Sequence, residues 1–137
     1  MYQQEHTVQY YETDRMGITH HSNYVRWMEE ARVGFLKDIG WDYAKLESSG
    51  IISPVTEVEC NYKKSTTFEE LVVIQVSVAE FKGVRLKLNY KMFNDQDELV
   101  CQASSEHCFL NGDGKLVCLK KDYPDFYQAI MEQLDEN

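Results

Sequence analysis

The sequence predicts an α+β fold in a single domain that spans residues 1–137. Three observations lead to this prediction: an isolated alternating segment near the start, one long and unusually apolar helix, and then a series of segments that alternate between apolar and polar residues. Hydrophobic residues make up 43% of the chain, and only two prolines interrupt it. This composition leaves no room for a flexible linker between separate domains.

A short strand and a long helix are expected in the first forty residues. Residues 6–11 alternate and predict a strand, with Val8 and Tyr10 on one face. A polar loop follows over residues 12–21, and a helix is expected over residues 22–39. The signals for its two ends are Ser22 or Asn23 as N-cap and Gly40 after the last turn.

The long helix is apolar over most of its surface. At about 100° per residue, its polar residues Arg26, Glu30 and Lys37 crowd into one narrow stripe. A helix with so little polar surface is expected to be wrapped by other structure. Its apolar side consists of Tyr24, Trp27, Met28, Ala31, Phe35 and Ile39, widened by Val25 and Leu36.

The pattern switches to a period of two after residue 50, which predicts antiparallel strands. One of these strands carries Arg85, Lys87 and Lys91 on its outer face. The signal Asn111–Gly114 is typical of a hairpin turn. The expected elements are a helix over 42–49 ended by Gly50, strands over 56–62, 72–78, 84–92, 99–110 and 116–119, and a terminal helix over 123–134.

Charge and composition exclude several classes of protein. Fourteen Lys and Arg residues face 23 Asp and Glu residues, for a net charge of −9. This balance argues against nucleic acid or an anionic membrane surface as a partner. No apolar run approaches the ~18 residues that cross a bilayer, and we expect a cytoplasmic protein because the N-terminus lacks a signal-peptide pattern. The four cysteines lack a metal-site spacing, so we expect free thiols.

The polar loop before the long helix is where we expect chemistry. A helix start offers unpaired backbone N–H groups and the positive end of the dipole, which suit a developing oxyanion. Asp14, a few residues upstream, is placed to act there as a nucleophile or general base. The alternative is that Asp14 only caps a turn. His20 and His21 have no evident third ligand, so no metal site is expected.

The same loop and helix carry a longer motif, formed by Tyr11, Asp14, Gly17, His21 and Tyr24 and continued by Trp27, Glu29, Ala31 and Arg32. This pattern resembles the 4-hydroxybenzoyl-CoA thioesterase family, and within it the bacterial acyl-CoA thioesterases of the YbgC/FadM type. The resemblance covers most of the chain and implies a hotdog fold, in which an antiparallel sheet wraps around a long central helix. It also implies a homodimer or homotetramer with active sites between protomers, and no cofactor, because CoA is part of the substrate.

The resemblance also implies residue roles in the hydrolysis of acyl-CoA to a carboxylic acid and free CoA. Asp14 matches the catalytic carboxylate, as nucleophile or general base. The backbone N–H of His21 matches the oxyanion donor, and Gly17 lets the loop approach the thioester. Two positions depart from the pattern, since many relatives have Asp at Glu12 and an aromatic residue at His20.

Substrate contacts are expected from the helix and from basic residues. Tyr24, Trp27 and Met28 are candidates to line or support an acyl pocket. An acidic protein must gather local positive charge to hold the phosphates of CoA, and the alternative for each basic residue is a solvated surface position. The phosphate candidates are Lys63, Lys64, the face formed by Arg85, Lys87 and Lys91, and the pair Lys120 and Lys121.

Other activities stay open at this point. A carrier-protein thioesterase is a close variant, a hotdog hydratase or dehydratase acts on related thioesters, and a non-catalytic protein would only bind them. Glu29 is either a second catalytic carboxylate or the ion-pair partner of Arg32, three residues further along the helix. The sequence does not specify acyl chain length, aromatic preference, or dimer against tetramer.

Overall fold

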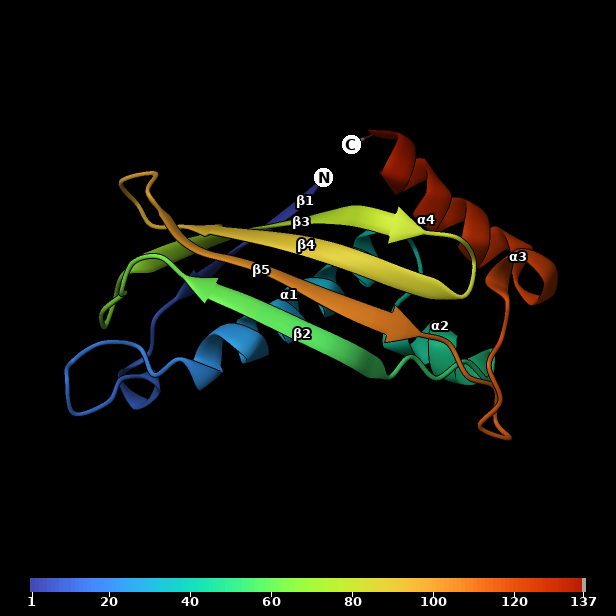
Figure 1. Ribbon diagram of the computed structural model, residues 1–137, viewed down its shortest axis with the longest axis horizontal. Helices are drawn as coiled ribbons and strands as arrows, with labels where there is room; N and C mark the ends of the chain where they lie inside the picture. Colours follow the sequence, from blue (N-terminus) through green and yellow to red (C-terminus); the bar gives the residue numbers. More distant parts are fainter. Residues whose placement is uncertain (137) are drawn as a thin grey trace.

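The structure, a computed structural model, describes residues 1–136, with side chains described for residues 1–134 (Figure 1). A five-stranded antiparallel sheet lies over a long helix, as the sequence predicts. The elements are β1 (Tyr2–Thr7), η1 (Tyr10–Glu12), α1 (Ser22–Asp38), α2 (Tyr43–Ser48), β2 (Val55–Tyr62), β3 (Leu71–Phe81), β4 (Arg85–Phe93), β5 (Leu99–Cys108), α3 (Leu119–Asp122) and α4 (Pro124–Glu136).

The strands lie in the order β1-β3-β4-β5-β2, so that β1 and β2 form the two edges of the sheet. All four pairings are antiparallel. Helix α1 runs along one face of this sheet (Figure 1). The α+β prediction and the central helix are therefore confirmed, and the arrangement is the hotdog fold.

The hydrophobic core forms between α1 and the inner face of the sheet. Strand β4 alternates between buried and more exposed residues throughout, and β3 does so up to a bulge after Val78, which turns every second side chain toward the helix. The predicted stripe of α1 is buried from Tyr24 to Phe35, while Ile39 is only partly buried. The large apolar residues that meet here are Trp27, Phe35, Ile74, Leu88 and Met92.

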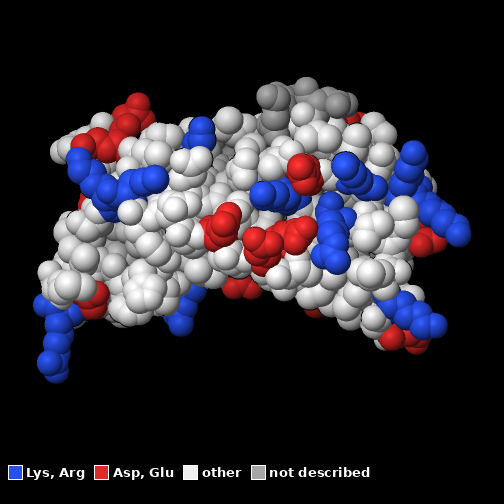
Figure 2. Space-filling model, viewed as in Figure 1, with Lys and Arg blue, Asp and Glu red and all other residues white. Residues whose placement is uncertain are grey.

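The outer face of β4 carries the predicted basic residues, and Arg85, Lys87 and Lys91 are exposed there. Acidic residues of the neighbouring strands lie among them, since Lys87 is in register with Glu80 and Glu106. Figure 2 shows acidic and basic side chains mixed on this side of the molecule. The face is thus a mixed-charge surface rather than a basic patch.

The N-terminal strand was predicted too late in the chain. It runs over Tyr2–Thr7 rather than 6–11, and Tyr10 is exposed in the turn η1 while Val8 is buried. The reason is a side-chain interaction: the carboxylate of Glu12 accepts the N–H of Gln9 and bends the chain out of the strand.

The last predicted strand, residues 116–119, is also wrong. Asn111 accepts the N–H groups of both Asp113 and Lys115 with its side-chain oxygen and closes a tight loop. Leu116 then makes one isolated bridge to Leu110, and helix α3 begins at Leu119. The preceding strand β5 accordingly ends at Cys108 rather than at residue 110.

The C-terminal helix α4 is part of the same core. Its Phe126 is fully buried and stacks on Trp41 with the ring centroids 4.6 Å apart. Phe109 meets Phe126 edge-on from the sheet side. This helix therefore covers the end of the molecule at which α1 stops (Figure 1).

Two further predictions concern the cysteines and the possibility of a membrane-spanning helix. The cysteines Cys60, Cys101, Cys108 and Cys118 are free thiols, as expected. In the part of the chain that the structure describes, every helix is too short or too polar to cross a membrane.

Candidate active site

The loop that precedes α1 is tied to the helix by a buried carboxylate. Glu12 is only 5% exposed, and its side chain accepts hydrogen bonds from Gln9 N–H, His6 Nε2 and Trp27 Nε1 at 2.7–2.8 Å. Burial raises the pKa of Glu12, but these hydrogen bonds outweigh it and the pKa lies below its ordinary value. A charged Glu12 therefore fixes the loop against Trp27, a role that sequence reasoning missed.

Asp14 and Gly17 form the tip of this loop. The chain reverses there, because Asp14 N–H donates to Ile18 O and Gly17 N–H donates to Asp14 O, both at 2.9 Å. One carboxylate oxygen of Asp14 accepts the N–H of Met16, and the other has no partner among the described residues. Gly17 has φ +78°, and an added Cβ would meet nothing within 4 Å, so backbone conformation explains the glycine.

The start of α1 presents a free backbone donor. The N-cap is His21, one residue earlier than predicted, and its side chain makes no capping bond. Instead, the imidazole of His20 bonds to the hydroxyl of Ser22 at 2.8 Å and accepts its N–H at 3.3 Å. Within residues 1–136, no acceptor bonds to the N–H of His21. This N–H lies where the helix dipole is positive.

A cavity of about 400 Å³ opens beside this helix start. Tyr24 and Tyr62 meet edge-on in its wall, with ring centroids 5.2 Å apart. Burial raises the pKa of both phenols, for Tyr62 to about 12, so both hydroxyls stay protonated at neutral pH. The lining residues are Ile18, Thr19, His21, Tyr24, Tyr62, Lys63, Lys64 and Ser65.

Hydrogen bonds among three hydroxyl groups hold the wall of the cavity in place. Thr66 is fully buried and bonds to the hydroxyls of Thr19 at 2.6 Å and Tyr24 at 3.0 Å. Thr19 also donates its backbone N–H to Thr66 O at 2.8 Å. These bonds join the loop before α1 to the loop before β3, so the cavity walls are held in one arrangement.

The structure brings together only some of the predicted substrate residues. His21, Tyr24, Lys63 and Lys64 line the cavity, whereas Asp14 lies across the loop turn from Ile18 and does not line it. Lys64 forms an ion pair with Glu98, and Lys63 has no side-chain partner among the described residues.

Three other predicted residues lie elsewhere. Trp27 is fully buried beneath the loop, and Met28 lines a second cavity further along α1. Arg85 lies at the opposite end of the sheet. Strand pairing puts Met92 of β4 level with Tyr62 of the cavity wall, and Arg85 is seven residues from Met92, or roughly 23 Å along the strand.

The pairing of Glu29 with Arg32 is not observed. No ion pair within 4 Å joins them, although both lie on α1 in the described part of the chain. The sequence analysis did not assign a structural role to Glu12, Thr19 or Thr66. The role of Glu12 could have been predicted, since Gln9 and Glu12 have the spacing of a capping box. No sequence pattern predicts the hydrogen bond between Thr19 and Thr66, because they lie 47 residues apart in the chain.

The fold is that of the hotdog thioesterases, and comparison with known proteins gives the same class. The profile of the thioesterase-like superfamily matches residues 8–134, so the chain belongs to this superfamily. The family recognised from the loop and helix is thereby confirmed.

Individual relatives carry related names. Bacillus subtilis YneP, named for acyl-CoA thioesterase activity, is 34% identical over 123 residues, which cover 89% of each chain. The acyl-CoA thioester hydrolase YbgC of Escherichia coli is 23% identical over 96 residues, or 70% of this chain and 72% of YbgC. The crystal structure of a DHNA-CoA thioesterase from Staphylococcus aureus superimposes with a TM-score of 0.91 and 35% identity, and the match covers 97% of this chain and 90% of the other.

Proposed function

We propose that this protein hydrolyses acyl-CoA thioesters to a carboxylic acid and free CoA, with the reacting carbonyl at the start of α1. The observation that supports this most directly is the unpartnered N–H of His21, a residue that lines a cavity at the positive end of a helix dipole. The relatives named above, two of which share about a third of their residues with this chain, supply the substrate class.

In the proposed reaction, Asp14 either attacks the thioester carbon or activates the water that does so, and the N–H of His21 stabilises the negative charge on the carbonyl oxygen. As a general base, Asp14 takes a proton from water, whose oxygen then bonds to the thioester carbon. As a nucleophile, its free carboxylate oxygen bonds to that carbon, and water cleaves the resulting anhydride. On either route the carbonyl oxygen becomes an oxyanion that accepts the His21 N–H, and the CoA thiolate leaves. A movement of the Gly17 turn would bring Asp14 to the cavity.

Lys63 is the proposed contact for the phosphates of CoA. It lines the cavity and its ammonium group is free of carboxylate partners among the described residues, whereas Lys64 would first have to release Glu98. Arg85 lies at the other end of the same protomer's sheet, and we leave it out of this site.

A second copy of the chain is the proposed partner, and it would pair along β2. This edge strand is exposed over almost its whole length, including the apolar residues Val55, Val58 and Tyr62. An unpaired strand edge with apolar side chains is a site for pairing with another strand. Because Tyr62 belongs both to this edge and to the cavity, the partner would lie next to the active site.

Thiol release from a panel of acyl-CoAs tests the proposal. Wild type should turn over at least one class among short, medium, branched and aromatic acyl groups. Asp14→Asn should lower kcat/KM by a factor on the order of 10² to 10⁴ and keep its circular dichroism spectrum. The matched control is Asp38→Asn, the same substitution at an exposed position at the end of α1.

The outcomes separate the remaining activities. Turnover that survives Asp14→Asn would remove Asp14 from the mechanism and make Glu29 the next carboxylate to test. Hydrolysis of acyl-carrier-protein esters alone would show a carrier-protein thioesterase. Hydration of enoyl-CoA would identify a hydratase, and tight binding of every ester without turnover would identify a binding protein.

A further inference from the structure

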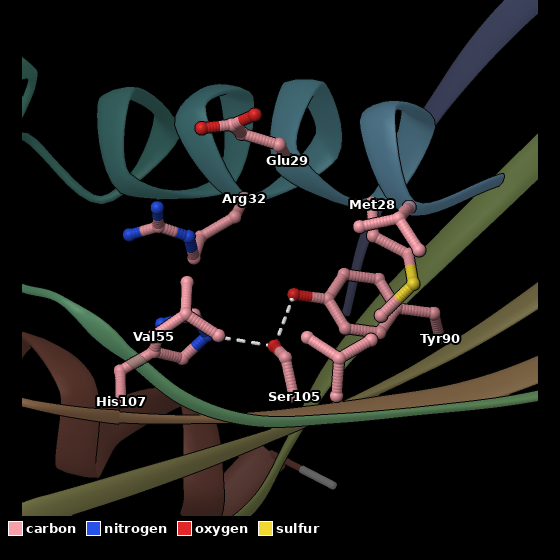
Figure 3. Close-up of a pocket in the computed structure, with 9 residues that line it drawn as sticks. Met28, Glu29, Arg32, Val55, Tyr90, Ser105 and His107 are labelled. Carbon is pink, nitrogen blue, oxygen red and sulfur yellow. Dashed lines mark hydrogen bonds between the residues drawn. The ribbon is translucent and has the colours of Figure 1, made fainter. Parts of the chain in front are cut away.

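The flank of α1 that faces the edge strand β2 carries one cation and one anion. Arg32 and Glu29 lie about one turn apart on this flank, and both line the second cavity, of about 100 Å³. The same cavity is lined by Met28 of α1 and by Val55 and Val58 of β2. In Figure 3, both charged groups extend to the left of their points of attachment on the helix. The two charges therefore lie together beside the open edge of the sheet.

Arg32 lacks an anionic partner within its own chain. It is 5% exposed, and no carboxylate of the described residues lies within 4 Å of its guanidinium. In the described structure its nitrogen atoms make no hydrogen bond, and none of these atoms is sealed from solvent. A largely buried charge without a partner costs folding free energy. Because the guanidinium is still reachable from outside, an anion from another molecule can pair with it.

The groups around Arg32 do not supply that anion. Its aromatic contact is the ring of Tyr43, 5.9 Å from the guanidinium carbon. Burial, and then the charge of Arg32, lowers the pKa of His107 to about 3, and burial raises the pKa of Tyr90 to about 12. His107 and Tyr90 are therefore both neutral at pH 7, and the positive charge of Arg32 is not compensated among the described residues.

Glu29 is an unpaired carboxylate on the same flank. It is exposed, and no Lys, Arg or His of the described residues lies within 4 Å of its oxygens. Its spacing from Arg32 on the helix allows an ion pair, yet the two do not form one. Each protomer thus offers a free anion and a free cation side by side, and a surface of this kind is complementary to a second copy of itself.

A two-fold axis at the β2 edge brings the two flanks together. The exposed apolar residues Val25, Val55 and Val58 line the cavity between α1 and β2. Two copies bury these residues against each other when both helices lie on the same face of the joined sheet. A two-fold axis perpendicular to the sheet gives this arrangement, and it makes the paired β2 strands and the two α1 helices antiparallel.

The position of the axis follows from the length of β2. When Val55–Tyr62 pairs with its own copy over the full strand, the axis crosses between Val58 and Glu59. Val58 lines the same cavity as Glu29 and Arg32, so the axis is level with this turn of α1. Arg32 of one protomer is then level with Glu29 of the partner subunit, and the reverse. The two residues are about 4.5 Å apart along each helix, so opposite charges alternate around the axis.

We propose that the guanidinium of Arg32 pairs with the carboxylate of Glu29 of the partner subunit, so that two reciprocal ion pairs join the α1 helices of the dimer. The proposal rests on the pairing of a second copy along β2 proposed above, and it does not depend on the thioesterase activity. Helices packed side by side have axes about 8–10 Å apart, a gap that the long side chains of Arg and Glu bridge. The second copy then covers the open side of the cavity.

Mixing two charge-reversed variants tests the pairing. In Glu29→Lys all four charges around the axis are positive, and in Arg32→Glu all four are negative, so each homodimer should have a Kd raised on the order of 100-fold. A heterodimer of the two variants restores both ion pairs, because the introduced lysine meets the introduced glutamate and the native Arg32 meets the native Glu29. An equimolar mixture should contain roughly 90% heterodimer in native mass spectrometry, whereas random pairing gives one half.

Matched charge reversals away from the edge serve as controls. Glu132→Lys lies on the exposed side of α4, and Arg85→Glu lies on the outer face of β4. Each should keep the wild-type dimer Kd, and their mixture should pair at random. Circular dichroism checks the fold of every variant. If Arg32→Glu does not fold, Glu29→Gln, Arg32→Gln and their double variant form a cycle in the dimer Kd, in which the double variant should lose less than the sum of the two single losses.

The outcomes distinguish the ion pairs from the other proposals. Random pairing in the mixture of Glu29→Lys and Arg32→Glu, or wild-type Kd values for both, would overturn the ion pairs. Recovery of the dimer in the double variant of these two substitutions, without recovery in the mixture, would show a pair within one chain and would also overturn them. A monomeric wild type would overturn both the ion pairs and the pairing along β2. Preferred heterodimers of a protein that hydrolyses no ester would support the ion pairs and reject the thioesterase function.

Discussion

At the scale of single residues, the buried carboxylate of Glu12 links the loop to the helix, and we predict that Glu12→Gln destabilises the protein. The amide can still accept one set of hydrogen bonds, but its NH₂ group would face the N–H of Trp27. We expect a loss of about 1–3 kcal/mol in the free energy of unfolding at pH 7, measured by urea denaturation. The control is Glu47→Gln on α2, whose side chain is exposed.

The pH dependence of the same variant follows from the lowered pKa of Glu12. Its stabilisation is present above the unfolded-state pKa, near 4.5, and is lost as the pH falls through the lower folded-state value. The stability difference between wild type and Glu12→Gln should therefore shrink between pH 6 and pH 3. A difference that stays constant over this range would show that Glu12 is not held in its charged form.

At the scale of elements, α4 belongs to the core rather than forming an appended tail. Phe126 is fully buried between Trp41, which follows α1, and Phe109, which follows β5, so its truncation leaves a cavity where these segments meet α4. We predict that Phe126→Ala lowers the free energy of unfolding by roughly 3–5 kcal/mol, measured by urea denaturation. Gln128→Ala on the exposed side of α4 should change it by less than about 0.5 kcal/mol, and an equal effect of both variants would contradict this role.

Most elements could be predicted because their periodicity is local. Strands β3 and β4 and helix α1 bury the faces that their apolar spacing indicates. The two wrong strands, at residues 6–11 and 116–119, fail where a polar side chain bonds to the backbone and ends the alternation. The spacing of apolar residues carries no information about such a hydrogen bond from a side chain to the backbone.

The site was predictable to a smaller extent. The loop and helix start were located from the sequence, and His21, Tyr24, Lys63 and Lys64 do line one cavity. The absence of an ion pair between Arg32 and Glu29 could not be predicted, because spacing on a helix allows such a pair but does not enforce it. The cavity at His107 depends on β5 facing α1, a contact between segments some 75 residues apart, such as Arg32 and His107.

At the scale of the whole molecule, both cavities open along one side, where α1 runs beside the edge strand β2. The exposed apolar residues Val25, Val55, Val58 and Tyr62 are also found along this line. The other edge strand, β1, is mostly polar, with the sequence Tyr-Gln-Gln-Glu-His-Thr. Only the β2 edge therefore combines unpaired backbone groups with apolar side chains among the described residues, and it is the edge that a second copy would cover.

Val58→Lys tests this assembly, because Val58 is 40% exposed at the middle of β2 and its replacement would place a charge within the proposed interface. We expect wild type to sediment as a dimer or tetramer, and the variant to dissociate with a Kd raised on the order of 100-fold, or about 2.7 kcal/mol. Leu116→Lys makes a comparable change at an exposed apolar residue in the loop before α3 and should leave the assembly intact. If both variants sediment like wild type, β2 is not the interface; if only Val58→Lys dissociates and also loses hydrolysis, then the active site needs the second protomer.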